Sequence, residues 1–191
     1  VGRFQLLGIT DVASLFVPSF QFVFREKDSY TADDVAAFLF THMREHGVPN
    51  WLMLEGGAWQ AEKVQGTVVR DDEGRAAARV GGLRSAGVEL LRAHDANDKT
   101  WMEARWNLLW TILTEVPGYV GRFRGEMREV NLLTQRLLKG AEDPRLHLWD
   151  YKRAVEKVRQ GIDLMNRRPV DTRDGSWIPA EKWASSPRVQ Q

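Results

Sequence analysis

The pattern of apolar and polar residues predicts two strands at the start of the chain. Residues 4–10 are mostly apolar, and residues 15–25 are rich in aromatic and β-branched side chains, which favour extended backbone. Asp11 and Ser14 lie between them, and both residue types stabilise turns by bonding nearby backbone groups. The pattern therefore predicts a hairpin. Because Pro18 has no N–H to donate, the second strand is expected at a sheet edge or at a bulge.

An amphipathic helix is predicted next. Thr31 is a typical N-cap, followed by two acids where the helix dipole favours negative charge, and Gly47 is a typical C-terminal stop. Residues 51–54 then read as a short buried strand. The order hairpin, helix, strand is typical of an α/β fold. The apolar stripe of the helix consists of Val35, Phe38, Leu39 and Met43.

The middle of the chain contains shorter elements. Residues 58–65 predict one short helix, and residues 88–93 predict another strand. Residues 66–83 contain four glycines and mixed charges, which indicates a surface insertion with a strand at 67–70. Three amphipathic helices and a tail rich in Pro, Gly and Ser are predicted after it. The helices are expected at residues 101–115, 126–139 and 148–166.

Composition excludes several classes of protein. The chain has 191 residues, enough for one domain of ordinary size with a sizeable core. It has no cysteine, which excludes disulfides, zinc-thiolate sites and thiol nucleophiles and fits a reducing cytoplasm. No apolar run is long enough to span a bilayer, so no membrane partner is expected.

Charge leaves a choice open. The formal net charge is +1, so the chain has no global basic field. The stretch from Tyr151 to Arg168, however, contains six basic residues and only two acidic ones. This stretch fits either contact with phosphate groups or an ordinary solvated helix face.

Two acids are candidates for metal chemistry. Glu55 ends an apolar strand and precedes two glycines, and Glu103 lies in the first turn of a helix, on one face with Asn107 and Trp110. Carboxylates that converge on two Mg²⁺ ions about 3.5–4 Å apart serve phosphodiester transfer, because one ion activates the attacking oxygen and the other stabilises the leaving oxygen. The alternative is a solvated turn acid at position 55 and an acid favoured by the helix dipole at position 103.

Several segments of the chain, together with their order along it, resemble the catalytic core of DDE-type transposases and retroviral integrases, especially Mu-like bacterial transposases. Residues 54–57 (LEGG) stand where the family has Asp-Asn-Gly, and residues 99–107 (KTWMEARWN) resemble the segment with its last catalytic Glu. The likeness extends to about residue 183. The other matching segments are residues 7–14 (LGITDVAS), 30–40, 46–49 (HGVP), 117–122 and 166–183.

The resemblance implies an α/β fold with an RNase H-like mixed sheet flanked by helices, followed by a C-terminal helical extension. It implies that Glu55 and Glu103 bind Mg²⁺ or Mn²⁺ for DNA cleavage and strand transfer at transposon ends. The partners would be transposon-end and target DNA, bound by a homo-oligomer in the bacterial cytoplasm and associated with the nucleoid when on DNA. The implied divisions are a core at 1–116, its helical extension at 117–169 and a tail or linker at 170–191.

Two departures from the family pattern change the expectations. Position 55 is Glu where the family usually has Asp, and Mg²⁺ tolerates little error in ligand geometry. The family's first catalytic Asp precedes the strand at residues 4–10, so more polypeptide is expected upstream of Val1. Asp11 is a doubtful candidate for that first acid, because the resemblance places it in the hairpin turn, outside the catalytic site.

Two other readings remain open. In the first, the chain is a catalytically degenerate DNA-binding or assembly module that keeps the RNase H-like fold. In the second, it is an unrelated α/β domain whose acids lie on the surface. Four basic residues are weaker candidates for DNA contact, through phosphates rather than bases, with ordinary surface charge as the alternative. They are Lys99, Arg105, Arg122 and Arg124.

Overall fold

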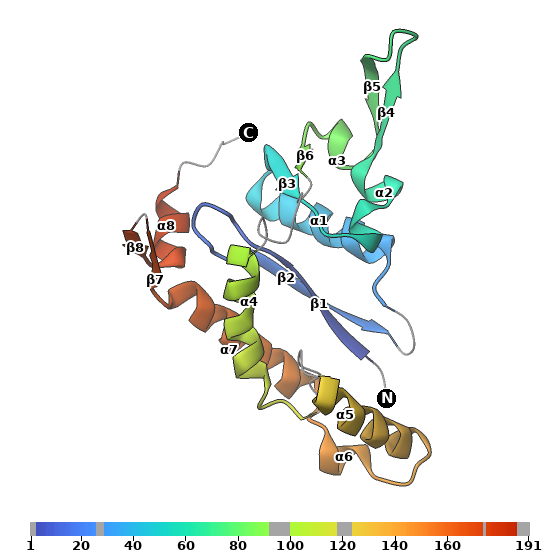
Figure 1. Ribbon diagram of the computed structural model, residues 1–191, viewed down its shortest axis with the longest axis vertical. Coiled ribbons are helices and arrows are strands. Elements are labelled where there is room, and N and C mark those ends of the chain that lie inside the picture. The colour runs from blue at the N-terminus through green and yellow to red at the C-terminus, as the bar shows by residue number, and fades with distance from the viewer. Residues whose placement is uncertain (1–2, 26–28, 92–99, 118–123, 174, 187–191) are drawn as a thin grey trace. The chain divides into compact units, whose positions relative to one another are not determined.

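A computed structural model describes residues 3–25, 29–91, 100–117, 124–173 and 175–186, and within them the chain is a mixed α/β protein (Figure 1). In chain order the elements are β1 (Arg3–Ile9), β2 (Ser19–Arg25), α1 (Ala32–His46), β3 (Trp51–Met53), the 3₁₀ helix η1 (Gly57–Gln60), α2 (Glu62–Gln65), β4 (Thr67–Arg70), β5 (Ala76–Val80), α3 (Gly82–Ser85), β6 (Glu89–Leu91), α4 (Thr100–Leu113), α5 (Arg124–Leu138), α6 (Pro144–His147), α7 (Tyr151–Arg167), β7 (Val170–Thr172), β8 (Gly175–Trp177) and α8 (Pro179–Ser185).

The described strands pair two by two. β1 and β2 form the predicted antiparallel hairpin, with Ile9 opposite Ser19. β3 and β6 are parallel, and Leu52 lies opposite Leu90. β4 pairs with β5 and β7 with β8, both antiparallel. Within the described ranges the strands therefore form four two-stranded sheets, where the sequence had indicated one mixed sheet.

The chain divides into two compact units. The first, here the sheet unit, comprises residues Arg3–Ile9 and Pro18–Lys99, as far as they are described; the second, the helical unit, comprises Thr10–Val17 and Thr100–Ser186. α4 therefore groups with the C-terminal helices, whereas the sequence placed the boundary after residue 116. The stretch predicted as a tail contains β7, β8 and α8.

The core of the sheet unit forms around α1. Thr31 caps this helix as predicted: its hydroxyl accepts from the backbone N–H of Asp34, and the Asp34 carboxylate accepts from the Thr31 N–H at 2.8 Å. The predicted stripe is buried at Val35, Phe38 and Leu39. It packs among buried apolar residues of the surrounding elements, which are Leu7, Val23, Leu54, Trp59, Val64, Leu83 and Val88.

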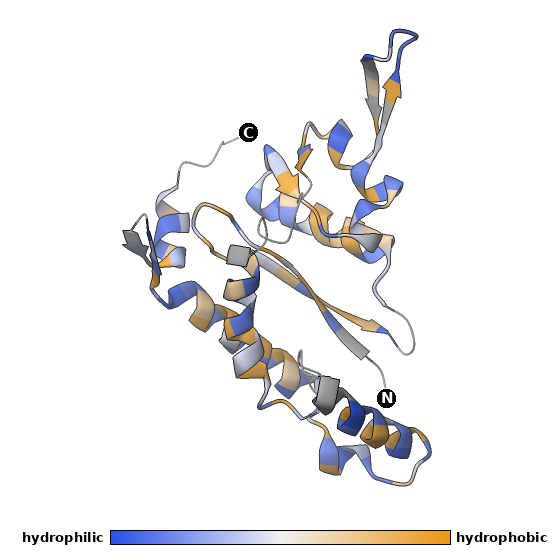
Figure 2. Cartoon of the chain, viewed as in Figure 1, coloured by the Kyte–Doolittle hydropathy of each residue, from blue (hydrophilic) through white to orange (hydrophobic). Residues whose placement is uncertain are grey.

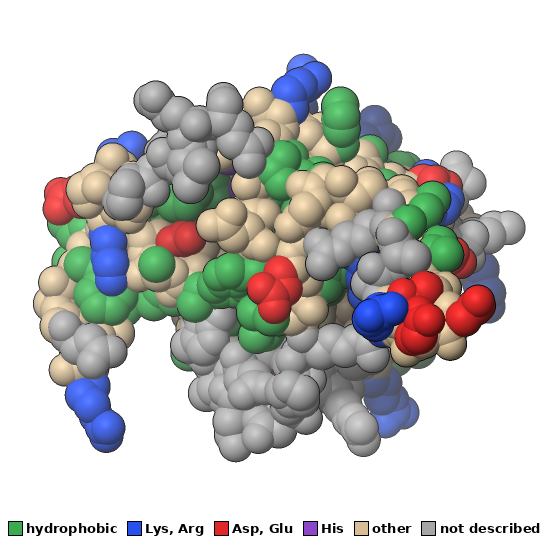
Figure 3. Space-filling model, turned by 90° about the horizontal axis from the view of Figure 1, so that it is seen from above, with side chains coloured by type: hydrophobic (Ala, Val, Ile, Leu, Met, Phe, Trp, Pro, Cys, Tyr) green, Lys and Arg blue, Asp and Glu red, His purple; other side chains and the backbone are tan. Residues whose placement is uncertain are grey.

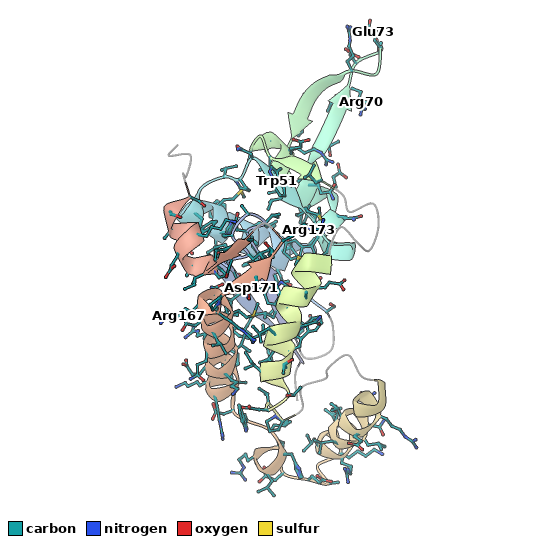
Figure 4. The ribbon with its side chains drawn as sticks, turned by 60° about the vertical axis from the view of Figure 1, so that its left-hand side comes forward. Trp51, Arg70, Glu73, Arg167, Asp171 and Arg173 are labelled. Carbon is teal, nitrogen blue, oxygen red and sulfur yellow. The ribbon has the colours of Figure 1, made fainter. Side chains whose placement is uncertain are left out.

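The glycine-rich insertion is a regular hairpin. β4 covers residues 67–70 as predicted, and its turn is closed by Asp71, whose carboxylate accepts from the Arg75 backbone N–H at 2.7 Å. Arg70 and Glu73 lie at this end of the hairpin (Figure 4). Val69 and Val80 are exposed. The hairpin is therefore held by its own turn and by the residues at its base.

The core of the helical unit lies between α4 and α7. Leu109 is fully buried against Gly161, where an added Cβ would come within 2.5 Å of the Leu109 Cδ1 atom. Apolar bands alternate with hydrophilic ones along α7 (Figure 2), which fits a helix with one buried face. The glycine thus permits close approach of the two helices.

The loop Thr10–Val17 packs on the C-terminal elements of the helical unit. The Phe16 ring stacks on Trp183 with ring centroids 5.4 Å apart, and the Trp177 indole N–H donates to the Ser14 carbonyl at 2.9 Å. The Trp106 indole donates to the Thr10 hydroxyl at 3.2 Å.

In the described part of the chain, no helix has the length and apolar character needed to cross a membrane.

Candidate functional site

Glu55 follows the short strand β3, in which Trp51 is exposed and Leu52 and Met53 are half-buried, so the sequence prediction of a buried strand is wrong for these residues. Leu54 is buried, the Glu55 side chain is exposed, and Gly56 and Gly57 follow, the latter at φ +64°, a backbone conformation that favours glycine. Among the described residues, Glu55 makes no hydrogen bond or ion pair.

The parallel pairing of β3 with β6 defines the edge at which Glu55 lies. In parallel strands the carboxyl ends point to the same edge, and this edge is the usual ligand-binding side of an α/β sheet. Glu55 follows β3 there, and the chain leaves β6 at Leu91 toward residues 92–99, which lie outside the described ranges.

Glu103 lies in the first turn of α4 and is exposed, as is Asn107 one turn later. This confirms that the two residues share a face of the helix, whereas Trp110, predicted on the same face, is half-buried. Glu55 belongs to the sheet unit and Glu103 to the helical unit. That the two carboxylates share a metal ion stays a prediction.

Asp11 occupies the turn that the sequence predicted. Its Oδ2 atom accepts from the Ser14 backbone N–H at 2.7 Å and from the Ser14 hydroxyl at 2.5 Å. These bonds give Asp11 a local structural role. Among the residues that the structure describes, no three His, Asp or Glu side chains are grouped so that they could hold a metal ion.

The basic candidates have different outcomes. Lys99 and Arg122 lie outside the described residues, as does the side chain of Arg124, which begins α5. Arg105 is described and is buried rather than on the surface. The alternative that Arg105 is an ordinary surface charge is therefore wrong, whereas its contact with a DNA phosphate stays a prediction.

The basic stretch of α7 is partly neutralised within its own unit. Lys157 pairs with Glu115 at 2.5 Å, Arg167 pairs with Asp163 at 2.9 Å, and the Arg153 guanidinium lies 4.0 Å above the Trp149 ring. These contacts favour a solvated face over most of the helix. The face of the molecule drawn in Figure 3 carries both basic and acidic side chains.

A serine–histidine pair was not indicated by the sequence. The Ser19 hydroxyl lies 2.8 Å from His42 Nδ1, and His42 is buried on α1 beside His46, with ring centroids 5.1 Å apart. The partners are 23 residues apart, so no local spacing reveals them. Burial, followed by the positive charge of His46, lowers the pKa of His42 to about 4.

This histidine predicts a pH-dependent stability. Its folded pKa of about 4 lies below the ordinary value of 6.5, so its contribution is full above pH 6.5 and is lost as the pH falls toward 4. Between pH 7 and pH 5 the free energy of unfolding should fall by about 2 kcal/mol. Urea titrations of the wild type and of His42→Gln measure it, and the variant should lose most of this pH dependence.

The matched control is His147→Gln. His147 pairs with Glu142 at 2.7 Å in the helical unit and should leave the loss near pH 5 unchanged. An unaltered pH profile in His42→Gln would show that other groups cause the acid sensitivity.

Comparison with known proteins gives a distant structural similarity and no match in sequence. No family model and no curated protein matches the sequence. The chain is similar to a chain in the cryoEM structure of a simian T-cell lymphotropic virus intasome in complex with PP2A regulatory subunit B56 gamma, at 13% identity and a TM-score of 0.48. The alignment covers 100% of this chain and 55% of that chain, so this chain spans about half of its length.

Proposed function

We propose that this chain is a DDE-type polynucleotidyl transferase core of RNase H-like fold, which cleaves DNA at transposon ends and joins them to target DNA. The observation that carries the proposal is local to the sheet unit. β3 and β6 are parallel, and an exposed acid, which makes no hydrogen bond or ion pair with the described residues, follows β3 at the ligand-binding edge. The altered second acid of the motif, Glu55, thus stands where a ligand-binding acid is expected.

Glu55 and Glu103 are the proposed ligands of Mg²⁺ or Mn²⁺. Carboxylate oxygens are the donors that these hard cations prefer, and both side chains are exposed. When bound, the cations supply positive charge that stabilises the attacking and leaving oxygens. Glu103 belongs to the first turn of α4, and Glu55 directly follows the buried Leu54.

The proposed reaction has two displacements at phosphorus. Water attacks the phosphodiester, a new P–O bond forms, and the P–O3′ bond breaks to release a 3′-hydroxyl. That hydroxyl then attacks a phosphodiester of the target, and the displaced target 3′-oxygen takes a proton. Because two ends must be joined together, we propose that the protein acts as a homo-oligomer on DNA.

Cleavage of a supercoiled plasmid in Mn²⁺ tests this function. Glu103→Gln and Glu55→Gln should each lower the nicking rate by about 100-fold or more, because the amide lacks the negative charge that holds the cation. The matched control is Glu115→Gln, another exposed glutamate of the helical unit, which pairs with Lys157. Undiminished nicking by Glu103→Gln would reject its role as a ligand.

One observation favours a second candidate function, a DNA-binding or assembly module without catalysis. Asp11 is engaged by Ser14, and the described residues contain no group of three metal-ligating side chains. For such a module, DNA binding survives in EDTA and no nicking occurs in Mn²⁺. Metal-dependent nicking would exclude it.

A further inference from the structure

His42 and His46 form a pair of imidazoles on successive turns of α1. They are spaced by four residues, so they share one face of the helix, and their ring centroids lie 5.1 Å apart with an angle of 42° between the ring planes. Imidazole nitrogens are common ligands of Zn²⁺, Ni²⁺ and Cu²⁺. Two histidines at this spacing on a helix are able to bind one such ion together.

The separation of the two rings fits a shared ion. A zinc–nitrogen bond of about 2.0–2.1 Å places the ion about 3 Å from the centre of each ring that binds it. Two ring centres about 5 Å apart then subtend an angle near 110° at the ion, which is the tetrahedral arrangement usual for Zn²⁺. The observed 5.1 Å therefore matches the separation that a shared ion needs, without a shift of the α1 backbone.

Ser19 favours one nitrogen of His42 as the ligand. Its hydroxyl lies 2.8 Å from Nδ1 of His42, at the start of β2, and β2 packs against α1 (Figure 1). A metal-bound histidine usually donates its second ring N–H to a neighbouring acceptor, which fixes the tautomer and the orientation of the ring. When Nδ1 donates to the Ser19 oxygen, Nε2 of His42 carries the lone pair that binds an ion.

Nε2 of His42 keeps contact with solvent. Among the described residues, the ring of His42 makes one hydrogen bond, through Nδ1. The buried side-chain polar atoms that lack a partner there are Nε of Arg25 and Nε and Nη2 of Arg105, and Nε2 of His42 is not one of them. His42 is also neutral at pH 7, because burial, followed by the positive charge of His46, lowers its pKa to about 4. No proton then competes with a metal ion for the ring.

We propose that His42 and His46 bind a divalent transition-metal ion, with Zn²⁺ as the occupant and Ser19 as a positioning residue. The two protein ligands are Nε2 of His42 and a ring nitrogen of His46. Water completes the coordination, since no group of three potential ligands occurs among the described side chains. The site uses nitrogen donors, so it is independent of the carboxylates in the proposed function.

Zinc binding by the whole chain at pH 7.5 tests the site. Zn²⁺ at about 100 times its dissociation constant should raise the unfolding temperature by several degrees. Isothermal titration calorimetry should show one ion per chain, with the affinity lowered about 100-fold in His42→Gln and in His46→Gln, because each loses a ligand. Mg²⁺ prefers oxygen ligands, so any shift that it causes should be the same in the wild type and in both variants.

The matched control is the double variant His94→Gln/His147→Gln, which leaves His42 and His46 as the remaining histidines of the chain. It should bind one Zn²⁺ with the wild-type affinity. Loss of zinc binding in the double variant, or unaltered binding in His46→Gln, would overturn the proposal. His46 is only half-buried, so His46→Gln gives the result even where His42→Gln fails to fold.

Ser19→Ala tests the positioning role. The affinity for Zn²⁺ should fall about 10-fold, as expected when a ligand loses its hydrogen-bond partner, and Ser19→Thr, which keeps the hydroxyl, should restore it. Ser85→Ala is the control, because the Ser85 hydroxyl donates to the Gly82 carbonyl on the exposed surface. Unchanged affinity in Ser19→Ala would overturn the assignment of Nε2. Absence of zinc binding in the wild type would reject the site and leave the proposed function standing.

Discussion

Replacing Gly66 by alanine is expected to lower the free energy of unfolding of the sheet unit by about 4 kcal/mol, the combined effect of backbone strain and a backbone clash. Gly66 has φ +80°, and an added Cβ would stand 1.9 Å from the Gly81 carbonyl oxygen and 2.8 Å from its carbon. Both atoms belong to the backbone, so no side-chain rotation relieves the contact. The reciprocal position is equally close, because a Cβ on Gly82 would stand 2.4 Å from the Gly66 nitrogen.

Gly74→Ala is the matched control for this prediction. Gly74 lies in the turn of the same hairpin at φ +78°, with nothing within 4 Å of an added Cβ. The control therefore isolates the conformational part, about 1–2 kcal/mol. Urea unfolding, with hydrogen exchange of peptides from β4 and β5 as the local readout, measures both variants. Equal losses for Gly66→Ala and Gly74→Ala would mean that the base of the hairpin is not tightly packed.

Features coded by neighbouring residues could be predicted from the sequence. α1 is the clearest case, because Thr31, Asp34 and Gly47 fix its ends and its apolar spacing fixes its buried face. The hairpin turn at Asp11 and the strand at residues 67–70 were found where turn chemistry and β-propensity placed them. These signals act within one or two turns of the chain, so they need no knowledge of the fold.

Features that depend on distant contacts could not be predicted. The strand expected from residue 15 begins at Ser19, because Leu15 has φ +63° and Pro18 cannot donate to a ladder. The intervening residues pack instead on elements more than 140 residues away, through bonds such as that from Val17 to Asn166. The helix predicted over residues 58–65 is interrupted at Ala61, whose ψ of 143° is extended.

Arg105 is an example of a charged residue type that conceals a buried position in a helix. Arg105, Leu109 and Leu113 are spaced by four, so all three fall on the buried stripe of α4. Because of its charge, Arg105 was considered for contact with a DNA phosphate or as an ordinary surface charge, although the spacing placed it on the buried stripe. Glu55 and Glu103 were found after a strand and in a first helical turn, where the sequence placed them, and their role in a site stays a prediction.

Replacing Asn166 by leucine is expected to lower the free energy of unfolding of the helical unit by about 3–5 kcal/mol, because two buried backbone groups lose their partner. The Asn166 Oδ1 atom accepts from the Val17 N–H at 2.9 Å, and its Nδ2 atom donates to the Val17 carbonyl at 3.1 Å. Val17 and Asn166 are both buried. Water cannot replace these bonds without opening the loop, and leucine offers neither a donor nor an acceptor.

Hydrogen exchange distinguishes this cause from a general loss of packing. In Asn166→Leu, the exchange rate of the Val17 amide should increase by a larger factor than the exchange rates of the α7 amides, because the Val17 N–H has lost its acceptor. Asn166→Asp should be intermediate, since a carboxylate still accepts from the N–H but repels the carbonyl oxygen. Asn131→Leu, on the exposed face of α5, is the matched control and should change stability by about 0.5 kcal/mol or less. If Val17 kept its protection in Asn166→Leu, the side chain would not be what holds the loop Thr10–Val17 to α7.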